Sequence, residues 1–136
     1  QASDFANQWL DMFGRKRKGT NTKAYMWHVF SVGRYPCLAG VEAQAVYRQQ
    51  SAVEYIVLSN DRDYAFITDL LPESCSLFDF LVFPPNFAWT MAFTHEAGWL
   101  GPYFARHEQY SALEAENQAK IRKAKESELA KLKGWR

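Results

Sequence analysis

The chain has 136 residues, of which 48% are hydrophobic and 23% charged, and its 16 Lys and Arg nearly balance its 15 Asp and Glu. This composition excludes disordered and collagen-like chains, and no apolar run approaches the roughly 20 residues that span a bilayer. We therefore expect one globular domain over residues 1–136, whose core is rich in the aromatic side chains that make up 16% of the sequence.

The first predicted element is a helix over residues 3–13. Ser3 is a suitable N-cap and Gly14 is a typical helix stop. Between them, large apolar residues recur at helical spacing: Phe5, Trp9, Met12 and Phe13. We expect this face of the helix to pack on the core.

Residues 23–32 read as a strand. Tyr25, Trp27 and Val29 alternate with Met26, His28 and Phe30, and apolar residues on both faces favour a central position in a sheet. A loop over residues 33–40, which contains Pro36, follows. A helix is expected next, over residues 41–50, with three apolar residues at helical spacing: Val41, Ala45 and Val46.

The middle of the chain predicts a series of antiparallel strands. Residues 53–59 and 64–69 are joined by Asn-Asp-Arg-Asp, which is typical of a hairpin, and residues 78–83 form a further strand. Residues 88–95 alternate clearly, with Trp89, Met91 and Phe93 on one face. Residues 102–106 are expected to pair with them, near a sheet edge because Pro102 has no N–H to donate.

A long helix is predicted over residues 108–133, because this stretch contains no Gly or Pro and is rich in Ala, Glu, Lys, Leu and Gln. Apolar residues recur every eleven positions, in two series: Tyr110, Ile121 and Leu132, and Leu113, Ala124 and Trp135. This thin stripe fits a helix that lies across the sheet, one that pairs with a second copy as a homo-oligomer, or one that stays partly exposed.

The order of these elements predicts an α+β fold with a single, mainly antiparallel sheet of five to six strands. We expect helices to cover one face of the sheet and a long C-terminal helix to follow. The predicted core spans about residues 24–107.

Charge is distributed unevenly along the chain. Residues 24–107 contain four basic and eight acidic residues, whereas residues 1–23 and 108–136 are both net basic. An acidic body favours a basic protein partner. The basic run Arg15, Lys16, Arg17 and Lys18 is a possible nucleic-acid contact, but glycines flank it and no aromatic residue interrupts it, so a solvated loop is the favoured interpretation.

The two cysteines, Cys37 and Cys75, are 38 positions apart and form no CxxC pair. We interpret them as thiols in a reducing cytoplasm rather than as a disulfide. No metal-ligand spacing or nucleotide-binding motif occurs, so neither a metal nor a cofactor is expected.

Four residues are candidates for catalysis. His95 and Glu96 adjoin a turn that contains Gly98, which suits a functional site better than a strand interior. His28 lies in an apolar pattern and is more readily explained as a core histidine. Cys37 follows Pro36 in a loop and is the only credible nucleophile, although a small buried hydrophobic residue is the simpler interpretation.

Three sequence blocks resemble a known family. They are WHVFS from Trp27, PCLAG from Pro36, and WTMAFTHE from Trp89, which is followed by GPYF from Gly101. Over about residues 25–107 the chain resembles a small bacterial family described as domain of unknown function 4275. The resemblance implies a small cytoplasmic bacterial protein without an established activity. The residues that it brings into focus are His28, Ser31, Cys37, Thr94, His95, Glu96 and Tyr103.

The leading hypothesis for function is a non-enzymatic protein-binding module, with immunity-type proteins that neutralise a basic toxin as one version. The predicted binding residues are Trp27, Ser31, Thr94, Tyr103, Asp61 and Asp63. A small hydrolase that uses the four catalytic candidates is one alternative. Nucleic-acid binding through the basic run is another.

Overall fold

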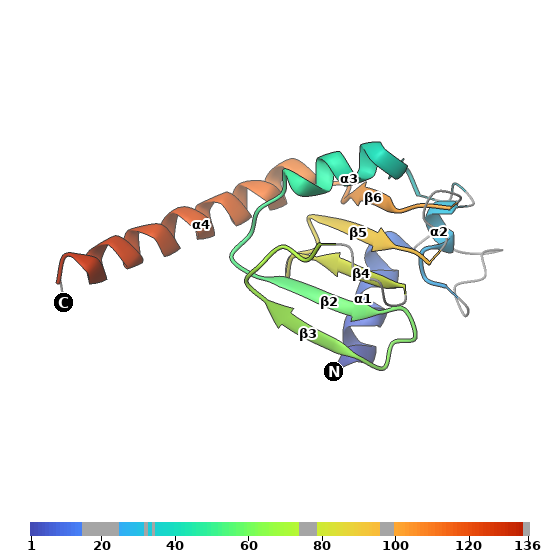
Figure 1. Cartoon of the computed structure of the whole chain (residues 1–136), viewed down its shortest axis with the longest axis horizontal. Helices are drawn as coiled ribbons and strands as arrows, with labels where there is room; N and C mark the ends of the chain where they lie inside the picture. The colour runs from blue at the N-terminus through green and yellow to red at the C-terminus, as the bar shows by residue number, and fades with distance from the viewer. Residues whose placement is uncertain (15–24, 32, 34, 74–78, 96–99, 135–136) are drawn as a thin grey trace.

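The structure, a computed structural model, describes residues 1–14, 25–31, 33, 35–73, 79–95 and 100–134. These residues form one open antiparallel sheet of six strands with helices packed against it, which confirms the predicted α+β class (Figure 1). In chain order the elements are α1 (Ala2–Phe13), α2 (His28–Ser31), β1 (Leu38–Ala39), α3 (Gly40–Arg48), β2 (Tyr55–Ser59), β3 (Ala65–Thr68), β4 (Phe80–Phe83), β5 (Trp89–Phe93), β6 (Tyr103–Arg106) and α4 (Tyr110–Leu132).

The strand order is β1-β6-β5-β4-β2-β3, so β1 and β3 form the two edges of the sheet. The predicted hairpin between β2 and β3 is confirmed. Its turn places Arg62 at a φ of 68°, and the N–H of Ser59 donates to the carbonyl of Tyr64 at 2.9 Å. The pairing of β5 with β6 is also confirmed, with Met91 opposite Phe104.

Helices cover both faces of the sheet, whereas the sequence led us to expect cover on one. On the first face, α1 and α2 pack against residues such as Ile56, Leu58 and Leu81. On the second face, α3 and the first turns of α4 pack against Val57 and Trp89, among others. Along β5 every side chain from Trp89 to Phe93 is buried. Because apolar side chains lie on both faces of the strand, both faces of the sheet require cover.

The predicted strand over residues 23–32 is wrong. In the described part of this segment, a turn at Met26 and Trp27 leads into α2, and no residue from 25 to 31 belongs to the sheet. Met26, Trp27, Val29 and Phe30 are all buried, which is the i, i+1, i+3, i+4 pattern of a helical segment. A segment that is apolar on every side does not distinguish the two periodicities. The sheet reaches six strands because Leu38–Ala39, expected to be loop, forms β1.

Two local expectations also need correction. Helix α1 begins at Ala2, so Ser3 lies inside it, and its buried face is made by Ala6, Trp9, Leu10 and Phe13 while Met12 is exposed. Helix α3 buries Ala43 and Tyr47, one turn apart, and leaves Val41 exposed.

Strand β6 lies near the edge of the sheet, as expected. The short strand β1 pairs with it and forms the edge itself.

Helix α4 is attached to the domain only by its first turns and then projects away from the sheet (Figure 1). Asn117 is its one buried residue in the described structure, and the Nδ2 of Asn86 donates to the carbonyl of Leu113 at 2.9 Å. Leu129 and Leu132 are exposed. The helix therefore does not lie across the sheet, and its pairing with a second copy stays a prediction. None of the helices in the described residues is long and apolar enough to cross a membrane.

Candidate functional site

The carboxylate of Asp79, just before β4, is buried and links three segments of the chain. Its Oδ2 accepts a hydrogen bond from the indole Nε1 of Trp27 at 2.5 Å. Its Oδ1 accepts the backbone N–H of His95 at 2.7 Å and lies 2.7 Å from the ring Nδ1 of the same residue. The segment before α2, the start of β4 and the end of β5 therefore meet at one side chain.

Aromatic rings surround this carboxylate. The Tyr25 ring stacks on Trp27 with centroids 5.2 Å apart and lies 5.1 Å from the His95 ring. His28 contacts both Tyr25 and Trp27, at 5.3 and 4.7 Å. Tyr103 also stacks on Trp27, with centroids 6.0 Å apart. Both described histidines of the candidate list thus belong to one aromatic cluster.

An open hollow of about 470 Å³ lies beside this cluster, lined by Tyr25, Ser59, Asn60, Asp61, Asp79 and His95. The His95 side chain is 46% exposed, in contrast to 4% for Asp79. The contact of Asp79 Oδ1 with both the backbone N–H and the ring Nδ1 of His95 sets the orientation of the imidazole.

Asp61 lies in the turn between β2 and β3 and forms the exposed wall of the hollow. Its Oδ1 accepts hydrogen bonds from the Ser59 hydroxyl at 2.6 Å and the Asp63 N–H at 3.0 Å. These bonds favour the charged form, and they hold the pKa of the Asp61 carboxyl below its usual range. Asp63 is exposed in the same turn but does not line the hollow.

The two parts of the third sequence block, WTMAFTHE and GPYF, pack directly on each other. The Thr94 hydroxyl donates to the carbonyl of Leu100 at 2.5 Å. Gly101 has a φ of 91°, and a Cβ there would lie 3.0 Å from Thr94 side-chain atoms and 3.1 Å from the Tyr103 ring. The close approach therefore requires a glycine between the two strands.

Cys37 lies apart from the hollow. Its Sγ is 4.0 Å from the carbonyl oxygen of Phe30, and burial raises the pKa of the thiol to about 11. A partly buried thiol that stays protonated is a poor nucleophile, so this environment disfavours the role that the hydrolase alternative gave it. Ser31 is also apart from the hollow, since its hydroxyl donates to the carbonyl of His28 within α2.

Several candidate residues lie outside the described part of the chain: Glu96, Cys75 and the basic run Arg15, Lys16, Arg17 and Lys18. Their roles stay predictions, as does nucleic-acid binding. Among the described residues, no group of three or more His, Cys, Asp or Glu side chains is placed to hold a metal ion.

Sequence reasoning missed Asp79 and Tyr25 as members of the site. Asp79 stands between two phenylalanines at the start of a strand in which the other residues are apolar, and an acid in such a place requires buried donors. That signal was available. Tyr25 was assigned to a strand face because the whole segment was read as a strand.

Comparison with known proteins agrees with the resemblance seen in the sequence blocks. No curated protein and no solved structure matches the chain. A family model matches residues 6–104, which begins earlier than the resemblance did and takes in most of α1, whereas α4 lies beyond it. Since the match covers well over half of the chain, this protein belongs to the family described as Domain of unknown function (DUF4275).

Proposed function

We propose that this protein is a binding module that takes an extended, basic segment of another protein along its edge strand β3. The observation that carries the proposal is an exposed apolar strand at a sheet edge with acidic residues at both of its ends. The exposed edge strand and the acidic residues at its ends support the proposal independently.

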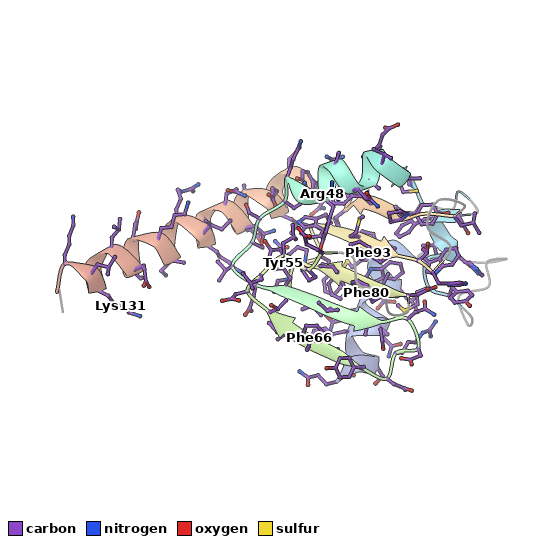
Figure 2. The ribbon with its side chains drawn as sticks, in the orientation of Figure 1. Arg48, Tyr55, Phe66, Phe80, Phe93 and Lys131 are labelled. Atoms are coloured by element: carbon purple, nitrogen blue, oxygen red, sulfur yellow. The ribbon has the colours of Figure 1, made fainter. Side chains whose placement is uncertain are left out.

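Strand β3 is the last strand of the sheet and pairs with β2 alone in the described structure. The side chains on it and beside it are apolar and exposed: Tyr64 at 63%, Phe66 at 43%, Ile67 at 51% and Leu70 at 74%. Figure 2 shows Phe66 on this outermost strand. Edge strands usually carry Lys, Pro or a bulge that prevents pairing, and the sequence Ala-Phe-Ile-Thr has neither residue type. An added strand would gain main-chain hydrogen bonds and cover these apolar groups.

Acidic residues stand at both ends of β3. Asp61 and Asp63 precede it and Asp69 follows it, and all three are exposed. Arg62 is the only base between residues 60 and 73, against four acids. Lysine or arginine side chains on the added segment would therefore meet complementary charge at either end.

The same charges disfavour a second copy of the chain as the occupant. Because both ends of β3 are acidic, either direction of self-pairing would bring carboxylates together, which costs free energy in the complex. A basic segment of a different protein is the occupant that fits. A protein that covers a basic toxin is one class that would use such a surface.

A defined probe for this proposal is a capped peptide of alternating lysine and valine, with the glutamate–valine peptide as its matched control. We expect the lysine peptide alone to shift the backbone amide resonances of Phe66 and Ile67 in an NMR titration. We also expect its affinity to fall as salt is raised, because the flanking charges are exposed and screened.

Paired variants separate the edge from general charge. Asp63→Asn with Asp69→Asn is expected to weaken lysine-peptide binding about threefold to tenfold, in line with exposed ion pairs. Glu42→Gln in α3 removes an exposed acid elsewhere and should leave the affinity unchanged. Equal binding of the glutamate peptide, or shifts that avoid β3, would overturn the proposal, as would a dimer in sedimentation that pairs through β3.

A further inference from the structure

The hollow beside His95 is lined by groups that attract cations. Asp61 provides an exposed carboxylate, and the Tyr25 ring lies 5.1 Å from the oriented imidazole of His95. The walls come from four separate segments: the turn before α2, the hairpin turn after β2, the start of β4 and the end of β5. The shape is thus set by tertiary packing rather than by one loop.

The position of the His95 imidazole is fixed by Asp79. Asp79 accepts from the His95 backbone and contacts its ring, while Trp27 occupies the second carboxylate oxygen. Both oxygens of Asp79 are engaged, so this buried carboxylate orients the His95 ring and adds negative charge to the lining of the hollow. Asp61 is the carboxylate that faces solvent.

We propose that this hollow binds a guanidinium or ammonium group, which lies against the Asp61 carboxylate and the Tyr25 ring, beside His95. A cation with several N–H donors matches a hollow with these groups in its walls, and an aromatic wall adds a cation–π contribution. Phosphate and carboxylate ligands are disfavoured, since two carboxylates border the same space.

The location of the hollow connects it to the proposed function. Ser59 ends β2, and Asn60 and Asp61 belong to the turn that leads into β3, so a basic side chain at one end of a segment added to β3 would lie next to the hollow. The source of the cation, a partner side chain, rests on the proposed function. The cation site itself does not, because a small molecule is enough to test it.

The probe is N-acetylarginine amide, and its neutral counterpart, N-acetylcitrulline amide, is the matched control. We expect the arginine derivative to shift the ring resonances of His95 and Tyr25 in an NMR titration and the citrulline derivative to leave them unchanged. Asp61→Asn should weaken this binding on the order of tenfold, since it removes the charge but keeps the oxygen that Ser59 and Asp63 bond.

Two further variants test whether arginine binding depends on the residues that line the hollow. Glu42→Gln in α3 removes an exposed charge away from the hollow and should leave arginine binding unchanged at physiological salt. Tyr25→Leu should weaken it, with the unfolding midpoint measured to show that the variant is folded. Equal binding of citrulline, or no effect of Asp61→Asn, would overturn the cation site.

Competition identifies the source of the cation. Displacement of the arginine derivative by the lysine–valine peptide assigns the hollow to a partner side chain, and lack of displacement assigns it to a free small cation. If the peptide binds β3 while the arginine derivative leaves His95 and Tyr25 unchanged, the cation site fails and the proposed function stands. The reverse result removes the proposed function and retains the site.

Discussion

The indole of Trp27 donates its N–H to Oδ2 of Asp79, and both groups are buried. The two residues are 52 positions apart, so this bond ties the segment before α2 to the start of β4. The other carboxylate oxygen receives the His95 N–H and thereby joins the end of β5 to the same point. Loss of the carboxylate would remove this acceptor from the Trp27 indole and from both the backbone N–H and the ring Nδ1 of His95.

Asp79→Ala is therefore expected to lower the free energy of unfolding by about 3 kcal/mol, because hydrogen bonds to a charged group are strong and the orphaned donors stay buried. Asp79→Asn should lose less, since its amide oxygen still accepts. Urea denaturation measures both variants. Asp63→Asn, at an exposed position, is the control and should change stability by under about 0.5 kcal/mol. If Asp79→Ala also changed the free energy of unfolding by under about 0.5 kcal/mol, the central role of Asp79 would be contradicted.

Gly101→Ala tests the close packing of Thr94 against Tyr103. The new Cβ would approach both side chains to about 3 Å in a left-handed backbone conformation, so conformational strain and overpacking add. We expect a loss of about 3 kcal/mol. Gly40→Ala is a matched control, because Gly40 also has a positive φ, 64°, but an added Cβ would meet nothing within 4 Å. It should cost about 1 kcal/mol. If thermal unfolding gave equal losses of stability for the two variants, the close contact of position 101 with Thr94 and Tyr103 would contribute nothing.

Two buried tryptophans offer a second comparison. The Trp9 Nε1 donates to the Thr90 hydroxyl at 2.9 Å and so joins α1 to β5, whereas the Trp89 Nε1 has no partner among the described residues. Trp9→Phe removes a hydrogen bond together with ring volume, but Trp89→Phe removes an N–H that is already unsatisfied. We expect Trp9→Phe to be the more destabilising by about 1 kcal/mol in urea denaturation. The opposite order would show that the hydrogen bond from Trp9 to Thr90 adds no net stability.

The parts of the fold that were predictable from sequence depend on local signals. The alternation of Trp89, Met91 and Phe93 and the turn residues of the β2–β3 hairpin both lie within a few positions of the structure that they specify. The Trp27 segment carried no such signal, because a stretch that is buried on all sides has no polar face to reveal its period.

The candidate site was only half predictable for the same reason. The block that contains His95 identified one member, but its partners are distant in sequence: Asp79 lies 16 positions before His95, and Tyr25 lies further away still. The register of β4 with β5 brings Asp79 to His95, whereas Tyr25 arrives by the packing of the segment before α2. The sequence of either partner alone encodes neither arrangement.

The thiol of Cys37 gives a pH-dependent test of its burial. Burial raises its pKa from an ordinary value of 9.0 to about 11. At pH 8 the folded protein therefore holds much less thiolate than the unfolded chain, and alkylation of Cys37 by iodoacetamide should be on the order of a hundredfold slower when folded. Peptide mass spectrometry reads Cys37 separately from Cys75.

The same shift has a defined sign in stability. Between about pH 9 and 11 the unfolded chain loses the thiol proton while the folded protein keeps it, so the free energy of unfolding falls as the pH rises through this range. Other groups also titrate there, and Cys37→Ala is the control that removes only this contribution. Wild type should lose more stability than Cys37→Ala from pH 9 to 11, and equal losses would mean that the thiol is as solvated in the folded protein as in the unfolded chain.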